Sequence, residues 1–299
     1  MTVDMPGTMG GAKICFTGSN SHNYSVTNQR RKGMFDLPKV GIVGLGFVGG
    51  AIQKAMADSC SLVLVDKDPS RGTHTYKDLF DCEGVFVCVP TPFGDDGRCD
   101  TSILEYVLEQ LEGYDGVIIS KCTAPPLVYR ELSKKHPNLV HAPEFLTAAN
   151  ADFDYLTGTF AIVGGRVKAY MDQAEKLIRF GQLHLKEVSH CSIEEASLAK
   201  YTINSFLATK VTFMNEIYRL SQSIGADYSK VARLVTNDER IGKSHMRVPG
   251  PDGSFGFGGA CFPKDTAALL KIGEQQGVDL QVLAAAVKKN TVLRLTDSK

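Results

Sequence analysis

The chain has 299 residues, with 33 lysines and arginines against 33 aspartates and glutamates, and 43% of its residues are hydrophobic. This length suffices for two domains with a sizeable core, and the balanced charge gives no reason to expect nucleic acid or an anionic membrane as a partner. No apolar run could span a bilayer, no signal-peptide core stands at the start, and the eight scattered cysteines form no Cys-x-x-Cys pair. We therefore expect a cytoplasmic protein with no metal site and no disulfide framework.

Residues 1–33 are polar, rich in glycine, serine and asparagine, and end in the basic run QRRKG without sustained periodicity. Such a composition cannot bury a core. It predicts a disordered extension, with Met34 as an alternative start.

From residue 38 onward, apolar runs of the buried-strand type alternate with amphipathic helical stretches. This alternation predicts an α/β fold in which residues 34–190 form a Rossmann-type, doubly wound parallel sheet. The expected strands occupy residues 39–46, 61–68, 84–90, 116–121, 138–145, 159–165 and 183–189. The clearest expected helices occupy residues 47–59, 102–113 and 125–136.

After residue 190 the strand signals stop, and residues 191–299 are predicted to form an all-helical central domain. One long helix is expected from about residue 192 to 223, opened by a capping box of Ser192 and Glu195. A shorter helix over 228–238, a glycine- and proline-rich loop over 237–262 and two closing helices follow. The long helix carries an apolar stripe too hydrophobic for a small domain to cover, so a homodimer built on it is expected. The stripe consists of Ile203, Leu207, Val211, Met214, Ile217 and Leu220.

The segment GLGFVG places Gly44, Gly46 and Gly49 between the first expected strand and the first expected helix. Glycines at this spacing let a pyrophosphate reach the helix N-terminus, and Asp66 ends the next strand at the distance typical of a ribose-binding acid. Asp66 would repel a 2′-phosphate, so the pattern favours NAD over NADP. The alternative is a tight turn without a ligand, which the strand–turn–helix context disfavours.

Three polar residues stand in apolar surroundings. Lys200 and Asn204 are four residues apart, hence on one face of the long helix, and Glu144 lies between apolar neighbours in APEFL. A carboxylate so placed often acts as an acid or base. A solvated lysine and asparagine and a glutamate in a salt bridge are equally consistent with the local sequence.

The stretch GFGGACFPKD crowds three glycines before Cys261 and places Pro263 where a helix would begin. A cysteine at a helix N-terminus, with Lys264 nearby, is expected to favour a thiolate near neutral pH. The glycines are expected to let a ligand approach the backbone. A structural cysteine in a glycine-rich turn is the alternative.

Taken in order, seven motifs resemble the nucleotide-sugar dehydrogenases of the UDP-glucose and GDP-mannose 6-dehydrogenase type. They are GIVGLGFVG, VCVPTPFGDDG, SKCTAPP, PEFL, LAKYTINSFLATKVTFMNEI, DERIG and GFGGACFPKD, and the resemblance runs from about residue 38 to the end. Such enzymes oxidise a sugar primary alcohol to a carboxylate in two steps with two NAD+. UDP-glucose is the expected substrate.

The resemblance also implies roles for individual residues. Cys261 is similar to the family nucleophile, which forms a thiohemiacetal and then a thioester. Lys200 and Asn204 resemble the residues that stabilise oxyanions, Thr123 and Asp265 the pair that orders the catalytic water, and Glu144 the glutamate implicated in hydrolysis. Sugar contacts are implied at Phe145, Leu146, Phe257 and Gly258, and at Arg240 across the dimer. NAD contacts are implied at Gly44, Gly46, Phe47, Val48, Gly49, Asp66, Arg71, Val89, Thr91, Cys122 and Lys264.

The sequence departs from the family in two places. Family members usually have an acidic residue and a glycine soon after PEFL, where this chain has PEFLTAAN. They also normally continue into a third domain that binds the nucleotide, and this chain is expected to lack it. Two alternatives therefore remain: a non-catalytic NAD-binding or assembly subunit, and a dehydrogenase of the 3-hydroxyacid type, which needs no cysteine nucleophile.

Overall fold

The computed structural model describes residues 37–94 and 98–296, where seven strands form one sheet in the order β2-β1-β3-β4-β5-β6-β7. The extension expected over residues 1–33 lies outside the described residues. The strands are β1 (Lys39–Val43), β2 (Ser61–Val65), β3 (Gly84–Val87), β4 (Val117–Ser120), β5 (Leu139–His141), β6 (Phe160–Gly165) and β7 (Glu187–Cys191).

The predicted parallel sheet is confirmed for β1 to β5, which pair in parallel. The last two strands differ, because β6 is antiparallel to β5 and β7 is parallel to β6. The reason lies in residues 142–159, which remain at the carboxyl edge of the sheet instead of crossing back over a face. The PEFL segment is thereby kept at the edge where ligands of parallel sheets bind.

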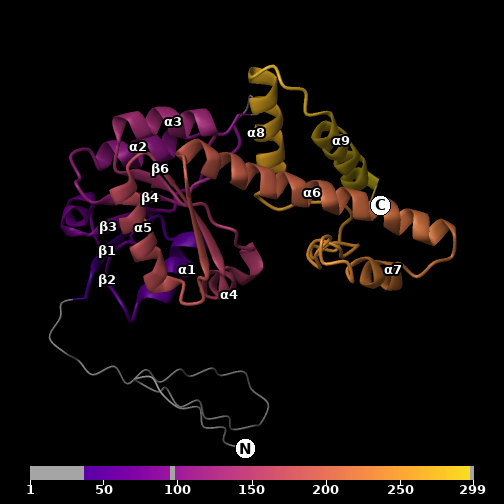
Figure 1. Cartoon of the computed structure of the whole chain (residues 1–299), viewed down its shortest axis with the longest axis horizontal. Coiled ribbons are helices and arrows are strands. Elements are labelled where there is room, and N and C mark those ends of the chain that lie inside the picture. Colours follow the sequence, from indigo (N-terminus) through magenta and orange to yellow (C-terminus); the bar gives the residue numbers. More distant parts are fainter. Residues whose placement is uncertain (1–36, 95–97, 297–299) are drawn as a thin grey trace, which may run out of the picture. The chain divides into compact units, whose positions relative to one another are not determined.

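Helices cover both faces of the sheet, as a doubly wound fold requires (Figure 1). On one face, Val40 and Ile42 pack with α1 (Phe47–Met56), α4 (Ala151–Thr157) and α5 (Lys168–Gly181). On the other, Val43 and Val85 pack with α2 (Ser102–Gln110) and α3 (Pro126–Lys135). Each buried aliphatic side chain contributes about 1.5–3 kcal/mol, so this core holds the strand ends in place. Two short 3-10 helices lie at η1 (Tyr76–Asp81) and η2 (Ala148–Asn150).

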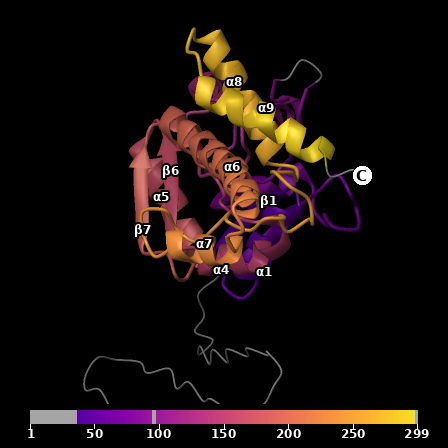
Figure 2. The same cartoon turned by 90° about the vertical axis from the view of Figure 1, so that its right-hand side faces the viewer.

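The remainder of the described chain is helical, as predicted. The helices are α6 (Ile193–Ser223), α7 (Tyr228–Val235), α8 (Phe262–Gln275) and α9 (Gln281–Thr296). Two views show α8 and α9 on one side of α6 and α7 on another (Figures 1 and 2). The capping box at Ser192 and Glu195 is confirmed, because each side chain bonds the backbone N–H of the other.

The apolar stripe predicted on α6 was expected to stay uncovered within the chain, and this holds for only part of it. Of its six members Met214 is buried, whereas Leu220 is 56% exposed. The buried side of the helix consists largely of small and polar residues, because α3, α8 and α9 pack closely against it. Among the described helices, none has the length and apolar character needed to cross a membrane.

Candidate active site

The glycine turn after β1 has the geometry of a dinucleotide site. Gly44 has a φ of +87°, and a side chain on Gly49 would collide with the Gly44 carbonyl oxygen. At Gly46, by contrast, a side chain would meet open space above the N-terminus of α1. Gly44 and Gly49 therefore allow the turn to pack, and Gly46 leaves room for a phosphate at the helix end. The predicted helix-opening residues Phe47 and Val48 follow, and Phe47 is exposed.

The acidic residue at the end of β2 lies beside this turn. Asp66 accepts hydrogen bonds from the backbone N–H of Leu45 at 2.6 Å and of Asp68 at 2.9 Å. Each carboxylate oxygen keeps a second lone pair, so a ribose hydroxyl could be bound as well. Arg71 lies at 3.5 Å from Asp68 and, with Gly46 and Phe47, lines a cavity of about 790 Å³. The residues present fit an adenosine ribose and a pyrophosphate.

The structure brings Lys200 and Glu144 together. The Lys200 ammonium donates to the Glu144 carbonyl oxygen at 2.5 Å and to its carboxylate Oε1 at 3.0 Å. Glu144 Oε2 in turn accepts from the backbone N–H of Leu146, and the Lys200 ammonium lies 5.2 Å from the centre of the Phe145 ring. The buried ammonium of α6 thus fixes the PEFL segment by charge and by cation–π contact.

A second polar set joins α6 to α8. The Asn204 amide donates to Asp265 Oδ2 at 2.5 Å, and Lys264 donates to Asp265 Oδ1 at 2.6 Å. Asp265 is 1% exposed, so this carboxylate is buried but matched by two donors. The arrangement orients the Asn204 amide and leaves its second N–H for another acceptor.

Cys261 caps the N-terminus of α8 and is exposed. Charges on Glu144, Asp265, Lys200 and Lys264 all act on its thiol. The expectation of a thiolate near neutral pH is wrong, because desolvation and the two carboxylates raise the pKa of Cys261 above its usual value and outweigh the lysines. The thiol is therefore the expected resting form, and a reaction through this sulfur would require a base to take its proton.

Two of the three glycines before Cys261 make room for side chains of this chain itself. A side chain on Gly256 would collide with Asn290, and one on Gly258 would collide with the guanidinium of Arg294. Both partners come from α9. These glycines therefore admit protein side chains to the loop, whereas Gly259, with a φ of +77°, faces open space.

The loops after β3 and β4 are tied together beside the site. The carbonyl oxygen of Thr123 accepts from the Thr91 hydroxyl at 2.7 Å and from the Cys99 thiol at 3.4 Å. Cys122 is buried, with its thiol donating to the Val87 carbonyl oxygen. Of the predicted cofactor contacts in this region, Val89 lies against Gly44.

Two predicted substrate residues are not presented to the site by this chain. Arg240 is exposed and bound to Asp238, and the side chain of Phe257 is 4% exposed. Arg240 was expected to act across a dimer, where it would serve the partner's site.

Sequence reasoning missed two buried residues close to Glu144. Lys121, at the end of β4, is 6% exposed; the charges of Glu144 and Lys200 act on it, and burial lowers its pKa to about 8. His141 ends β5, stacks on Tyr129 at 4.2 Å, and burial lowers its pKa to about 3. A polar residue at the carboxyl end of a buried strand was the signal available for both.

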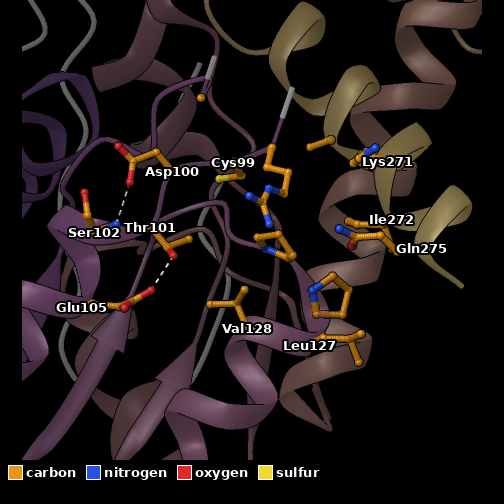
Figure 3. Close-up of a pocket in the computed structure, with 15 residues that line it drawn as sticks. Cys99, Asp100, Thr101, Ser102, Glu105, Leu127, Val128, Lys271, Ile272 and Gln275 are labelled. Atoms are coloured by element: carbon orange, nitrogen blue, oxygen red, sulfur yellow. Dashed lines mark hydrogen bonds between the residues drawn. The ribbon is translucent and has the colours of Figure 1, made fainter. Parts of the chain in front are cut away.

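A cavity of about 520 Å³ lies beside these groups, between α8 and the loops that precede α2 and α3. Figure 3 shows Lys271, Ile272 and Gln275 of α8 on one side of it and Cys99 on the other. None of the described lining residues is a predicted catalytic, cofactor or substrate residue. Its lining residue Cys99 links it to the site, because the Cys99 thiol donates to the Thr123 carbonyl oxygen.

The sheet, the glycine turn and the acid at the end of β2 define a Rossmann-type dinucleotide-binding protein with a helical domain. The chain belongs to the UDP-glucose/GDP-mannose dehydrogenase family, because the model of its NAD binding domain matches residues 70–180 and that of its central domain matches residues 194–292. NAD is accordingly its cofactor.

Curated relatives agree with this assignment. The chain is 33% identical over 224 residues to UDP-glucose 6-dehydrogenase TuaD of Bacillus subtilis, covering 71% of this chain and 47% of that protein. It is 34% identical over 227 residues to UDP-glucose 6-dehydrogenase of Pseudomonas aeruginosa, covering 71% and 49%. The chain thus spans about half the length of these relatives.

Solved structures show the same fold. A UDP-glucose dehydrogenase of Pyrobaculum islandicum superposes with a TM-score of 0.74 at 23% identity, covering 89% of this chain and 70% of that one. A 3-hydroxyisobutyrate dehydrogenase of Mycobacterium tuberculosis superposes with a TM-score of 0.68 at 15% identity, covering 84% and 92%. At these identities the likeness concerns the fold.

Proposed function

We propose that the chain catalyses the NAD-dependent oxidation of the C6 alcohol of a nucleotide sugar to a carboxylate, with UDP-glucose as the substrate. The observation that carries the proposal is the convergence of Cys261, Lys200, Glu144, Asn204 and Asp265 from three distant parts of the chain. A structural cysteine in a turn would not need two buried lysine–carboxylate pairs acting on its thiol.

The overall balance is one alcohol, two NAD+ and one water giving one carboxylate, two NADH and three protons. Bound NAD+ would supply the oxidising power for both steps, held at Gly46 and Asp66. After the first oxidation, the Cys261 sulfur adds to the aldehyde carbon. The carbon–sulfur bond forms, the S–H bond breaks, and the proton that the thiol gives up balances the one that the carbonyl oxygen receives, to give a thiohemiacetal. The second oxidation removes a hydride from that same carbon and the proton from its hydroxyl group, leaving a thioester on Cys261.

The surrounding residues have complementary tasks. The Lys200 ammonium and the second N–H of Asn204 would donate to the substrate oxygen as charge develops on it. Glu144 would remove a proton from the water that attacks the thioester, breaking the carbon–sulfur bond and returning the thiol. Asp265 holds the Asn204 amide by its Oδ2 and the Lys264 ammonium by its Oδ1, and with Thr123 it would orient that water.

The test is a steady-state assay of NADH formation with a panel of nucleotide sugars. The expected result is two NADH per uronic acid, with UDP-glucose as the best substrate. NAD binding without NADH formation from any member of the panel would instead favour a non-catalytic subunit.

The fold likeness to 3-hydroxyisobutyrate dehydrogenase favours a 3-hydroxyacid dehydrogenase as another candidate. Such an enzyme would keep its activity after alkylation of Cys261, and the proposed enzyme would lose it.

All seven described cysteines are free thiols, which supports our placement of the reaction in the reducing cytoplasm.

We also propose that the active form is a homodimer paired along α6. Phe206, Phe213 and Leu220 project from this helix at intervals of seven residues and are 67%, 57% and 56% exposed. A seven-residue apolar repeat is the spacing by which one helix packs along another. Arg240, on the loop after α7, would then reach the partner's site.

A further inference from the structure

The loop that leads to Cys261 has little regular structure of its own. Between Gly256 and Ala260, no backbone–backbone hydrogen bond within the described residues fixes its course. Gly256 and Gly259 have φ values of +73° and +77°, which lower the barrier to other conformations. Something outside the loop must therefore hold it.

Asn290 of α9 supplies that constraint. Its Oδ1 accepts from the backbone N–H of Phe257 at 2.7 Å, and its Nδ2 donates to the carbonyl oxygen of the same residue at 3.0 Å. One side-chain amide thus satisfies both backbone groups of Phe257, much as a neighbouring strand would. Asn290 is buried, so each of these bonds would leave an unsatisfied group if broken.

Two other side chains complete the constraint. Arg294, one turn further along α9, donates from Nε to the Phe257 carbonyl oxygen at 2.9 Å and from Nη2 to Asp252 at 2.7 Å. Asn215 of α6 accepts from the backbone N–H of Gly256 at 3.1 Å. The loop is therefore attached to two helices, and side chains of α9 fill the space beside Gly256 and Gly258.

The constraint extends to the start of α8. The Phe257 ring is buried and meets the Phe262 ring edge to face, with centroids 6.3 Å apart. Phe262 directly follows Cys261 and opens α8. Rotation of the Phe257 backbone would therefore move the residue that carries the thiol.

We propose that Asn290 is a positioning residue: by binding the backbone of Phe257 on both sides, it fixes the place of the Cys261 sulfur relative to Lys200, Glu144 and Asp265. The expected effect of Asn290 on catalysis rests on the proposed function, but its effect on the position of the Cys261 thiol can be measured without turnover. Arg294 supports the same arrangement from the next turn of α9.

The experiment compares Asn290→Ala with Thr291→Ala, an exposed neighbour whose hydroxyl bonds only the Val287 carbonyl oxygen among the described residues. The rate of Cys261 alkylation by iodoacetamide is measured from pH 6 to 10 by peptide mass spectrometry in the full chain. Because a displaced thiol would leave the surroundings that raise its pKa, Asn290→Ala should raise the alkylation rate near pH 7.5 by about threefold or more. Turnover should fall by about tenfold or more, with the KM for NAD unchanged.

The buried thiols Cys60 and Cys82 report on general unfolding, since they pack on opposite faces of the sheet. They should stay unreactive in Asn290→Ala and in Asn290→Asp, which keeps the acceptor for the Phe257 N–H but loses the donor. If they become reactive together with Cys261, Asn290 serves general stability and the proposal is wrong. It is also wrong if the alkylation profiles of Asn290→Ala and Thr291→Ala coincide. An inactive wild-type chain would refute the proposed function, and the alkylation comparison would still decide the role of Asn290.

Discussion

The Lys200 ammonium donates to both the backbone carbonyl and the carboxylate of Glu144, at 2.5 and 3.0 Å. The two residues are 56 positions apart, so the pair joins the long helix α6 to the carboxyl edge of the sheet. Both side chains are nearly buried, with 4% and 12% of their area exposed. Their charges act on the Cys261 thiol in opposite directions.

The first prediction follows from that opposition. Because the Glu144 carboxylate raises the pKa of Cys261, Glu144→Gln should lower this pKa and speed alkylation near neutral pH. Lys200→Met removes a charge that lowers the pKa and should slow alkylation. Glu131→Gln, an exposed control paired with Lys134, should change neither. Shifts in the same direction for both site variants would contradict the assignment.

Local signals in the sequence were sufficient for much of the fold. The glycine turn, the strands β1 to β5 and the Ser192 cap follow from short-range patterns that tertiary packing did not override. The direction of β6 could not be predicted in this way, because it depends on whether residues 142–159 cross a face of the sheet. The buried side of α6 could not be predicted in this way either, because α3, α8 and α9 together decide which of its residues are covered.

The candidate site residues were chosen from motifs, which did not reveal the groups that surround them. The glycines before Cys261 gave no indication that Asn290 and Arg294 would fill their space, since the contact spans 33 residues. The pKa of Cys261 was expected to fall because the helix start and Lys264 were evident in the sequence. Desolvation of the thiol and the approach of Glu144 were not evident in the sequence.

The second prediction concerns cofactor choice. Asp66 lies where an adenosine ribose would bind, and its charge would repel a 2′-phosphate. Calorimetric titration should give binding of NAD about tenfold tighter than of NADP, and Asp66→Ser should narrow this difference. Asp58→Ser, an exposed control, should leave the ratio unchanged. Equal affinity of the wild-type chain for both cofactors would disprove the role given to Asp66.

The third prediction concerns assembly. Phe213 lies in the middle of the exposed repeat of α6, so Phe213→Glu would place a charge in the proposed dimer interface. Light scattering at micromolar concentration should show a dimer for the wild-type chain and a monomer for this variant. Phe153→Glu replaces a phenyl group of similar exposure on α4 and should remain dimeric. A wild-type monomer with full activity would rule out the dimer.

The fourth prediction concerns acid stability. His141 is fully buried and its pKa is lowered to about 3, whereas in the unfolded chain it should protonate near its usual value. Below about pH 6.5 the unfolded state therefore binds more protons, and the free energy of unfolding should fall as the pH drops toward 3. Urea titrations at pH 7 and pH 5 should show a fall about 2 kcal/mol larger for the wild-type chain than for His141→Phe.

The matched control for that measurement is His184→Phe, because His184 is exposed. This variant should keep the wild-type dependence on pH. Phenylalanine at 141 can retain the stacking on Tyr129, so the comparison removes the titrating group while the ring packing is preserved. An unchanged dependence in His141→Phe would show that another group is responsible.

The last prediction concerns the nucleophile. Serine in place of Cys261 keeps the size of the side chain, but its alkoxide is harder to form and its ester is a poorer acyl donor than a thioester. Cys261→Ser should therefore stop the production of uronic acid. The variant should stall after partial oxidation or accumulate a covalent ester, which mass spectrometry of the intact chain would detect. The Gly44–Gly49 turn lies on a separate element, so NAD binding there should be unaffected. A purely structural cysteine would instead give a small loss of stability with turnover intact, and uronic acid formation at the wild-type rate would end the assignment of Cys261 as nucleophile.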